Sequence, residues 1–562
     1  GIPARLEWSD LLNSRLTGAL EAYESNGDRF YFWAARQSSD LERGIIDVAF
    51  SRIGVARMPL DIVQSLTDRL RKSVDYFLQI KIALDGDHHR VVSEVQQNIE
   101  LISRLSVRLP ASAAEEIFKW AVSLAHSNAV VHWWLYKQVG NLLQRSLEAI
   151  PPENRKNFSE QAIFLPLPGE KNNGGNEEDW PELITHFKTS QISRPTEKWK
   201  WSERISTLIR YVRSGSPLDR SRSLLRLQAL YAANALEAQE VSDFADAIWA
   251  HTNPTTGFPE AHRVRNFIFL DLPEKVPGAV VEIFLSSVVD VVADGKIDGE
   301  IMANLRGALK ASKHLLAQSK EKFPRIFNVC LQWQPPAEVD FNFSLIEETA
   351  RYIEFEIAMC LDQAVLPSLD VEHVSCEMKE AWRGRVQAER YGSFVMTAYH
   401  LVRLFPDCEA EVIRAIRKAI YSGDDNRVYA GLYAIQRMAE NTQVLTNTAF
   451  NLLVSSVVSI CEAMKEPCLD FALTVATDLV RRELVNKSEA DRLAESLEPI
   501  WENYSYQSNG VSDDRAIALP LVRAQSVRLA EALEGRVSDY FPDQILEQAK
   551  EDPMPEVRFA IV

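Results

Sequence analysis

Apolar residues recur at helical spacing along most of the chain. The stretch after Pro59, "LDIVQSLTDRLRKSVDYFLQIKIAL", has one apolar stripe, formed by Ile62, Val63, Leu66, Leu70, Val74, Phe77 and Leu78. This spacing of three and four residues predicts an amphipathic helix that begins directly after Pro59. Residues 87–109 repeat the pattern, which ends before Pro110. The chain is therefore predicted to consist of helices joined by short connections.

About twenty such segments of about 12 to 25 residues follow one another, and the alternation typical of strands is nearly absent. Three of them are "LTNTAFNLLVSSVVSICEAM", "EPCLDFALTVATDLVRRELV" and "SEADRLAESLEPIWENY". Consecutive amphipathic helices on short loops pack antiparallel, because neither helix can bury its apolar face alone. A single globule cannot absorb so many pairs, whereas a stacked array can. We therefore predict an all-α fold, an α-solenoid of about twenty antiparallel helices in two lobes.

The closing stretch, "EDPMPEVRFAIV", combines a capping Asp, a turn-favouring Pro and a Val-Arg pair before an Ala. These residues are Asp552, Pro553, Val557, Arg558 and Ala560. An Asp at a helix start accepts hydrogen bonds from free backbone amides, and a small residue lets two helices approach closely. The stretch resembles the second helix of a HEAT repeat. The resemblance implies an array of helix pairs that binds other proteins.

Two further stretches are similar to the same signature. "SGDDNRVYAGLYAIQRMAE" has Asp424 or Asp425 near the helix start and the small Gly431 within it, but Tyr429 where the Arg would stand. "SPLDRSRSLLRLQALYA" is a weaker match. The ending "VRFAIV" lacks the polar outer face of a terminal repeat. We therefore expect that more protein follows or that another surface covers this face.

The content of Pro, Gly and Asn rises sharply at residues 151–198. This composition predicts an irregular connection that contains a short helix at residues 181–187. Pro335 and Pro336 mark a second break between packets of helices. The expected organisation is an N-terminal helical lobe at residues 1–150, the connection at 151–198, middle repeats at 199–334 and truncated C-terminal repeats at 335–562.

Charge and cysteine content narrow the functional classes. The 562 residues carry a formal net charge of −17, so the chain as a whole is repelled by nucleic acid and by anionic membranes. No run of eighteen apolar residues occurs, and we expect no membrane span. Unpatterned cysteines predict reduced thiols in the core of a cytoplasmic protein. The six cysteines are Cys330, Cys360, Cys376, Cys408, Cys461 and Cys468.

Motifs for nucleotide, metal or nucleophilic chemistry are absent from the sequence. It contains no GxxxxGK[ST], GxGxxG, GxSxG or HExxH pattern. "DVVADGKIDGEI" imitates a calcium loop, but Val292 stands where an oxygen ligand is needed and Ile301 where the bidentate Glu belongs. We therefore expect no cofactor, no metal and no catalytic residue in this chain, so that any catalysis falls to an attached domain.

The main positive feature is a basic segment at residues 198–226 of this acidic chain. Arg204, Arg210 and Arg213 are expected on the solvent-directed arc of a helix whose apolar residues share the other face. Interleaved arginines and aromatic residues suit an acidic protein partner or nucleic acid, while a solvated or salt-bridged face is the alternative. The candidate partner-binding residues are Trp199, Trp201, Arg204, Arg210, Tyr211, Arg213, Arg220 and Arg222.

These features predict a non-catalytic scaffold or regulatory arm that binds a protein partner or flanking domains of its own polypeptide. Similar helical arms occur in large multidomain sensors, including bacterial antiviral proteins in which they follow a sirtuin-like or nucleotide-hydrolysing effector. That resemblance implies coupling to an attached effector domain. Two alternatives stay open: a nucleic-acid-binding repeat protein that uses segment 198–226, and an all-helical enzyme with non-local catalytic residues. The sequence also leaves the oligomeric state open.

Overall fold

The computed structural model describes much of the chain, and helices are the regular elements of the described part. The predicted all-α class is therefore confirmed. Two compact units are present, and each is described by itself: unit 1 is Gly1–Ala247, Glu502–Ala524 and Glu547–Val562, and unit 2 is Ile248–Trp501 and Gln525–Leu546. The described residues are 50–80, 88–127, 133–159, 161–167, 170, 182–187, 192, 194, 198–249, 275, 395, 398–404, 406–440, 445–506, 513–537 and 541–561.

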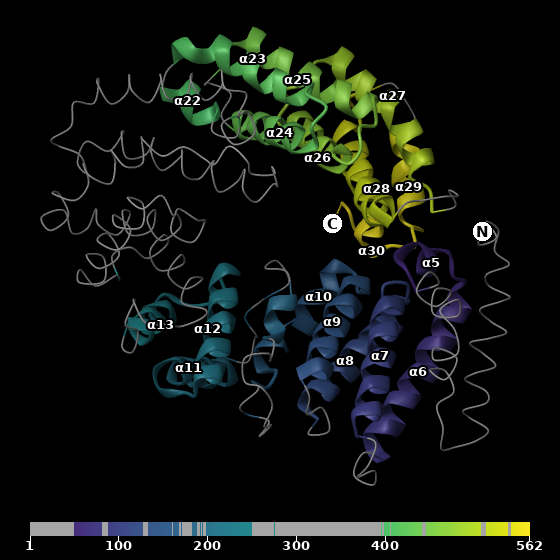
Figure 1. Ribbon diagram of the computed structural model, residues 1–562, viewed down its shortest axis with the longest axis vertical. Helices are drawn as coiled ribbons and strands as arrows, with labels where there is room; N and C mark the ends of the chain where they lie inside the picture. The colour runs from purple at the N-terminus through teal and green to yellow at the C-terminus, as the bar shows by residue number, and fades with distance from the viewer. Residues whose placement is uncertain are drawn as a thin grey trace, which may run out of the picture. The chain divides into compact units, whose positions relative to one another are not determined.

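Unit 1 is built from helices that pack on their neighbours along the chain (Figure 1). Its described helices include α5 (Arg52–Arg57), α6 (Leu60–Ile80), α7 (His88–Ser106), α8 (Ala111–His126), α9 (Trp133–Ala149), α11 (Lys198–Ser214), α12 (Pro217–Ala232) and α13 (Ala238–Trp249). α6 packs on α7, α7 and α8 both pack on α9, and α11 packs on α12. The predicted stripe of α6 faces inward, since Leu66, Leu70 and Val74 are buried.

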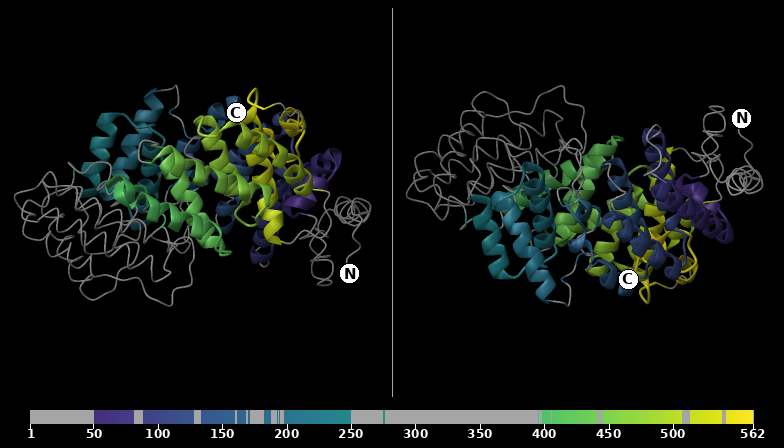
Figure 2. Two further views of the ribbon diagram at one scale, coloured as in Figure 1. Left: turned by 90° about the horizontal axis from the view of Figure 1, so that it is seen from above. Right: turned by 90° about the horizontal axis from the view of Figure 1, so that it is seen from below.

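Unit 2 shows the stacking of an α-solenoid. Its described helices up to residue 503 are α22 (Ala398–Leu404), η10 (Pro406–Cys408), α23 (Glu409–Ile420), α24 (Asp425–Ala439), α25 (Asn447–Glu462), α26 (Leu469–Arg481) and α27 (Lys487–Asn503). α23 contacts both α24 and α25, and α26 contacts both α24 and α25, so each pair covers the apolar face of the pair before it. This stack is green in Figures 1 and 2. α28 (Asp513–Leu533) and α29 (Phe541–Ala549) each begin in one unit and end in the other.

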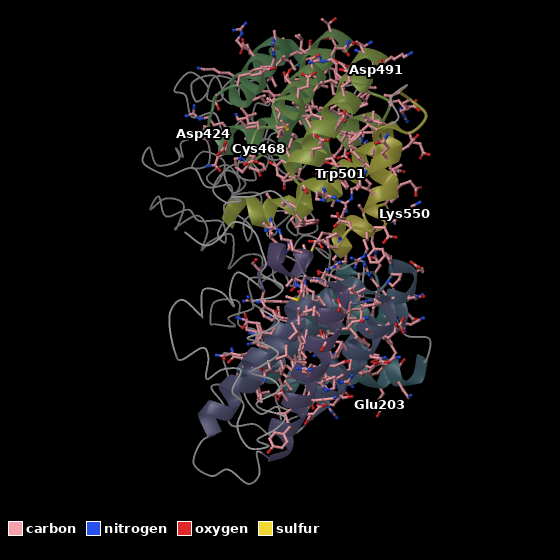
Figure 3. All side chains as sticks on the ribbon, turned by 90° about the vertical axis from the view of Figure 1, so that its right-hand side faces the viewer. Glu203, Asp424, Cys468, Asp491, Trp501 and Lys550 are labelled. Carbon is pink, nitrogen blue, oxygen red and sulfur yellow. The ribbon has the colours of Figure 1, made fainter. Side chains whose placement is uncertain are left out.

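Several helix starts lie where the sequence predicts them. α6 begins at Leu60, directly after Pro59. The side chain of Asp424 accepts a hydrogen bond from the backbone amide of Arg427 at 3.0 Å and caps α24 (Figure 3). Ser216 caps α12 in the same way. The position predicted for Asp424 at a helix start is therefore confirmed, and both residues satisfy a backbone amide that has no partner within the helix.

The closing stretch differs from the predicted helix start. Its helix, α30 (Pro555–Arg558), begins after the predicted start at Asp552 and Pro553 and has Met554 at the N-cap position. Asp552 is buried, and its carboxylate accepts hydrogen bonds from the Tyr506 hydroxyl at 3.0 Å and from the Met554 amide at 2.9 Å. Asp552 thus organises a buried polar cluster and does not start a two-turn helix.

The apolar face of residues 552–560 is covered by helices from the other end of unit 1. α30 packs on α9, and Val557 is buried completely. The Arg558 guanidinium donates a hydrogen bond to the backbone oxygen of Val107 at 3.1 Å. Arg52 forms an ion pair with Glu556 at 3.1 Å. The expectation that another surface covers this face is therefore confirmed for Val557 and Ala560, whereas Ile561 is 45% exposed.

The connection at residues 151–198 lies inside unit 1 and contributes to its core. Its described helices are α10 (Pro152–Ser159), η3 (Ala162–Phe164) and η6 (Leu183–His186). η6 falls where the sequence predicts a short helix, but it is a 3-10 helix. Leu165 and Leu183 are fully buried, so this irregular segment supplies core residues. The first part of unit 1 ends farther along, at Ala247. The predicted break at residues 335–336 lies outside the described residues.

The cysteines in the described part lie in the core. Cys408, Cys461 and Cys468 are buried (Cys468 is labelled in Figure 3). Burial, with a smaller contribution from Glu462, raises the pKa of the Cys461 thiol to about 12, so this thiol stays protonated and unreactive. The prediction that the cysteines lie in the core is confirmed at these three positions. The other three cysteines lie outside the described residues.

A close helix crossing in unit 2 depends on Gly431. A Cβ atom at this position would lie 2.7 Å from Cγ1 of Ile420 and 3.4 Å from the backbone oxygen of Ile416. We expect Gly431→Ala to lower the free energy of unfolding of unit 2 by about 1–2 kcal/mol, because the added methyl group overpacks the crossing of α23 and α24. Urea denaturation followed by circular dichroism measures the change.

Helix propensity alone predicts the opposite sign, since alanine stabilises a helix interior by about 1 kcal/mol relative to glycine. A more stable Gly431→Ala variant would therefore contradict the close crossing. The matched control is the same substitution in an Ile420→Ala background. Truncating Ile420 removes the clashing atom, so Gly431→Ala should then become neutral or stabilising.

Candidate interaction groove

The predicted basic segment forms α11 and α12, and part of it is turned into the fold. Trp201 is completely buried, and its indole Nε1 donates a hydrogen bond to Glu240 at 3.1 Å. The Arg194 guanidinium lies 5.0 Å from the centre of the Trp201 ring and also pairs with Glu240. Trp201 therefore anchors α11 to α13. The side chain of Trp199 lies outside the described part of the structure.

The helical pattern predicted that Arg204 lies on a solvent-directed arc, and the structure shows that this prediction is wrong. Its guanidinium donates hydrogen bonds to the backbone oxygens of Ile163 at 3.1 Å and Leu165 at 2.9 Å, and it pairs with Glu170 at 2.6 Å. Burial alone would raise the pKa of the Glu170 carboxyl, but the hydrogen bonds and charge of Arg204 outweigh burial and hold that pKa below its usual range. The helical pattern misplaced Arg204 because it takes no account of the segment that folds over this face.

The other candidates of this segment divide into buried and exposed side chains. Arg222 is buried next to Ser221, and Arg220 donates a hydrogen bond to the backbone oxygen of Gly215. Arg210 and Arg213 are exposed, and Tyr211 is half-buried with the Arg210 guanidinium 5.6 Å from its ring centre. The segment therefore presents fewer side chains to a partner than its sequence suggests. Partner binding by the exposed residues stays a prediction.

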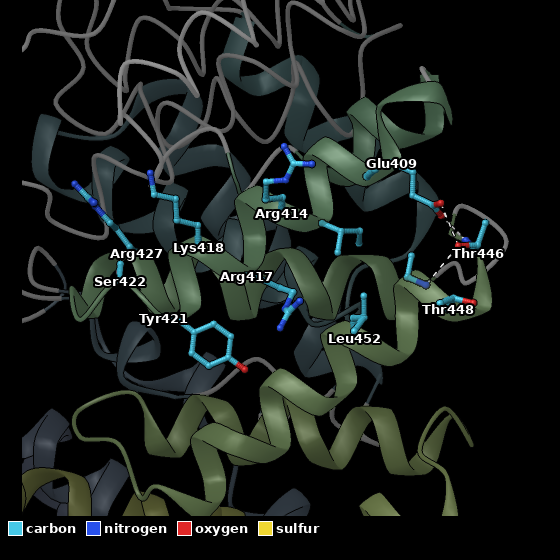
Figure 4. A pocket seen from close by; sticks show the side chains of 13 residues that line it. Glu409, Arg414, Arg417, Lys418, Tyr421, Ser422, Arg427, Thr446, Thr448 and Leu452 are labelled. Atoms are coloured by element: carbon cyan, nitrogen blue, oxygen red, sulfur yellow. Dashed lines mark hydrogen bonds between the residues drawn. The ribbon is translucent and has the colours of Figure 1, made fainter.

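A second basic surface lies in unit 2, where the sequence analysis had singled out no site. It is a groove of about 840 Å³ between α23, the start of α24 and the start of α25 (Figure 4). Its lining residues are Glu409, Ala410, Ile413, Arg414, Arg417, Lys418, Tyr421, Ser422, Arg427, Thr446, Thr448, Ala449 and Leu452.

The basic side chains of the groove come from the outer face of α23. Arg414, Arg417, Lys418 and Tyr421 follow at spacings of three, one and three residues, so they share one face of the helix, and all four are exposed. The opposite face is apolar and buried, as Val412 and the isoleucines of α23 show. Amphipathicity therefore fixes where these cations point, because the apolar face packs on α24 and α25.

An aromatic and an aliphatic side chain complete the groove. Tyr421 is 57% exposed and Leu452 is 43% exposed, which is unusual for large apolar groups in a well-packed helical array. The Tyr421 hydroxyl lies 3.3 Å from Oγ of Ser456 on α25, and the Arg417 guanidinium lies 6.0 Å from the Tyr421 ring centre. The exposed ring is thus held at both its hydroxyl and its face.

One end of the groove is acidic. Glu409 accepts hydrogen bonds from both the backbone amide and the hydroxyl of Thr446, the latter at 3.1 Å. Thr446 in turn caps α25. In Figure 4, Glu409 and Thr446 lie at one end, Lys418 and Arg427 lie toward the other, and Arg414 and Arg417 lie between. The charge of the groove therefore changes along its length, from negative at Glu409 to positive at the arginines and Lys418.

The described part of the chain offers a surface for binding and no metal centre. No group of three His, Cys, Asp or Glu side chains in it is arranged to hold a metal ion. None of the helices searched there combines the length and apolarity needed to cross a membrane. The calcium-like stretch at residues 290–301 lies outside the described residues. The arrangement at α23–α25 can bind a ligand by charge and apolar contact.

Comparison with known proteins gives only remote structural likenesses. No family model and no curated protein matches the chain. Among solved structures it is similar to Kap121p, with 10% identity, a TM-score of 0.44, and coverage of 98% of this chain and 59% of Kap121p. It is also similar to a chain in a homology model of the full-length AP-3 complex, with 13% identity, a TM-score of 0.29, and coverage of 96% and 98%.

A third match is a circular tandem repeat protein, with 13% identity, a TM-score of 0.14, and coverage of 89% of this chain and 97% of that one. The chain spans 59% of the length of Kap121p. At such identities a likeness concerns the fold alone, so function must be argued from the groove. From the helix stacking described above, the chain is an all-α helical-repeat protein of the α-solenoid class.

Proposed function

We propose that this protein is a non-catalytic helical-repeat scaffold that binds a protein partner through the groove of α23–α25. The observation that carries the proposal is a cluster of exposed cations beside an exposed tyrosine and leucine, on a chain with a net charge of −17. Arginine and tyrosine are enriched at the centres of protein interfaces, where one long side chain supplies both charge and contact area. The proposed partner therefore presents an acidic surface.

A protein suits the groove better than nucleic acid does. A nucleic acid requires a continuous stripe of cations along its backbone, whereas Glu409 places a carboxylate at one end of this groove. The exposed Leu452 offers contact to an apolar side chain and nothing to a phosphate. The net charge of the chain also repels a polyanion, while a small acidic patch on a protein is attracted locally. Coupling of this binding to an attached effector domain stays a prediction.

The test is capture of partners from the native cell with matched variants. The groove variant is Arg414→Glu/Lys418→Glu, which reverses two exposed charges on α23. The control is Arg482→Glu/Lys487→Glu, which reverses two exposed charges elsewhere in unit 2. Each reversal changes the charge by two, so both variants move the net charge from −17 to −21.

Proteins that bind the groove should fall at least about tenfold in the groove variant and stay unchanged in the control, since removal of a hot-spot cation typically costs at least about 1–2 kcal/mol. Quantitative mass spectrometry of the captured proteins measures this. Equal recovery with the two variants would show that the groove does not bind the partner. Equal circular dichroism spectra would establish that both variants are folded.

A further inference from the structure

The groove has the length of a short peptide segment. Tyr421, the C-cap of α23, lies twelve positions after Glu409. At a helical rise of about 1.5 Å per residue, this corresponds to about 18 Å. An extended chain advances about 3.3 Å per residue, so about five or six residues span this distance. Arg414, Arg417 and Lys418 lie within this length, and Arg427 on α24 adds a further cation to the lining of the groove.

The hydroxyl of Ser456 positions the two exposed apolar side chains of the groove, Tyr421 and Leu452. Ser456 donates a hydrogen bond from Oγ to the backbone oxygen of Leu452 at 2.9 Å, and the same Oγ lies 3.3 Å from the Tyr421 hydroxyl. Ser456 is buried, whereas Tyr421 and Leu452 are exposed. This bridge holds the Tyr421 ring over the turn of α25 that carries Leu452. The groove thus offers a preformed apolar contact next to its cations, which reduces the ordering cost of binding.

From this geometry we infer that the groove binds a short acidic segment of a partner protein that carries a bulky apolar side chain. The carboxylates of the segment pair with Arg414, Arg417 and Lys418, and its apolar side chain packs on Tyr421 and Leu452. The part of the segment nearest Glu409 is uncharged or basic, because two carboxylates placed together repel each other. This inference rests on the proposed function and specifies the chemistry of the partner.

Fluorescence polarisation with synthetic peptides and the full chain tests the inference. The probe is a fluorescein-labelled hexapeptide of four glutamates and two leucines. Its controls are a hexapeptide of four glutamates and two serines, a hexapeptide of four lysines and two leucines, and an oligothymidine of six nucleotides. The protein variants are Arg414→Glu/Lys418→Glu, Leu452→Ser and the control pair Arg482→Glu/Lys487→Glu.

The glutamate–leucine peptide should bind at least fivefold more tightly than the glutamate–serine peptide, and the lysine peptide should not bind. Arg414→Glu/Lys418→Glu should weaken binding at least tenfold, and Arg482→Glu/Lys487→Glu should leave it within twofold. Leu452→Ser should remove the preference for leucine and leave the affinity for the serine peptide unchanged. Comparison of the two glutamate peptides on the unaltered chain and on Leu452→Ser therefore distinguishes a peptide that packs on Leu452 from one that is bound by charge alone.

Four outcomes overturn the inference: no peptide binds, the lysine peptide binds, the glutamate–leucine peptide binds with no sensitivity to the groove variants, or oligothymidine binds more tightly than any peptide. The proposed function is judged separately by the capture experiment. If the groove variant loses captured proteins while no peptide binds, the scaffold function stands and the partner docks through a folded surface, so the peptide inference alone fails.

Discussion

Replacing Arg226 with methionine is expected to lower the free energy of unfolding of unit 1 by about 3–5 kcal/mol. The side chain of Arg226 is fully buried, and its Nε lies 2.6 Å from Oε1 of Glu182, whose side chain is 1% exposed. The same guanidinium donates hydrogen bonds to the backbone oxygens of Ile163 and Leu165. Without Arg226, the buried Glu182 carboxylate loses the guanidinium that balances its charge, and the two carbonyls each lose one donor and keep the hydrogen bond from Arg204.

Urea denaturation followed by tryptophan fluorescence measures this effect, since the buried Trp201 lies in the same unit. The double variant Arg226→Met/Glu182→Gln removes both charges and should recover at least about 2 kcal/mol of the loss. Arg210→Met, an exposed change on the neighbouring helix, should cost less than about 0.5 kcal/mol. If the single and double variants are equally stable, the buried ion pair does not control the packing of this segment.

Replacing Asp552 with alanine is expected to release residues 552–560 from α9 and to cost about 3 kcal/mol. The Asp552 carboxylate is 0% exposed and accepts hydrogen bonds from the Tyr506 hydroxyl and from Arg523, whose Nε is 2.9 Å away. Its removal leaves a guanidinium and a hydroxyl without their buried acceptor. Hydrogen exchange should accelerate in α30, and in α5 through the loss of the Arg52–Glu556 ion pair.

Two controls define this effect. Glu551→Ala changes the exposed neighbour and should leave exchange unchanged. Tyr506→Phe deletes one donor and should cost about 1 kcal/mol. Burial and the Asp552 charge raise the pKa of Tyr506 far above its usual range, so the hydroxyl stays protonated and this cost should be constant between about pH 6 and about pH 9. Unchanged exchange in α30 after Asp552→Ala would mean that the cluster does not hold the segment.

The helices could be predicted from the sequence because their signals are local. The start of α6 after Pro59, the Asp424 cap and the three segments that became α25, α26 and α27 depend on residues within one or two turns. The contacts of Arg204 and Arg226 could not be predicted in this way. They depend on Ile163, Leu165, Glu170 and Glu182, which lie far away in sequence, and a helical pattern cannot indicate which distant residues cover a face.

The basic side of the groove has a signal in the sequence. In "EVIRAIRKAIYSG" the cations Arg414, Arg417 and Lys418 share one face with Tyr421, while the residues between them are apolar. That pattern is a basic, aromatic face at helical spacing. Leu452 and Ser456 could not have been assigned to the same surface, because their place beside Tyr421 follows from the packing of α25 on α23.

The contact between Arg558 and Val107 also sets an order of events during synthesis. These residues are 451 positions apart, and at about 5–20 residues per second a ribosome needs roughly 20–90 s to add that length. The surface of α9 that receives α30 is therefore made long before its covering segment exists. Unit 1 can reach its final packing only when translation has passed Arg558, and chaperones have that interval in which to hold the nascent chain.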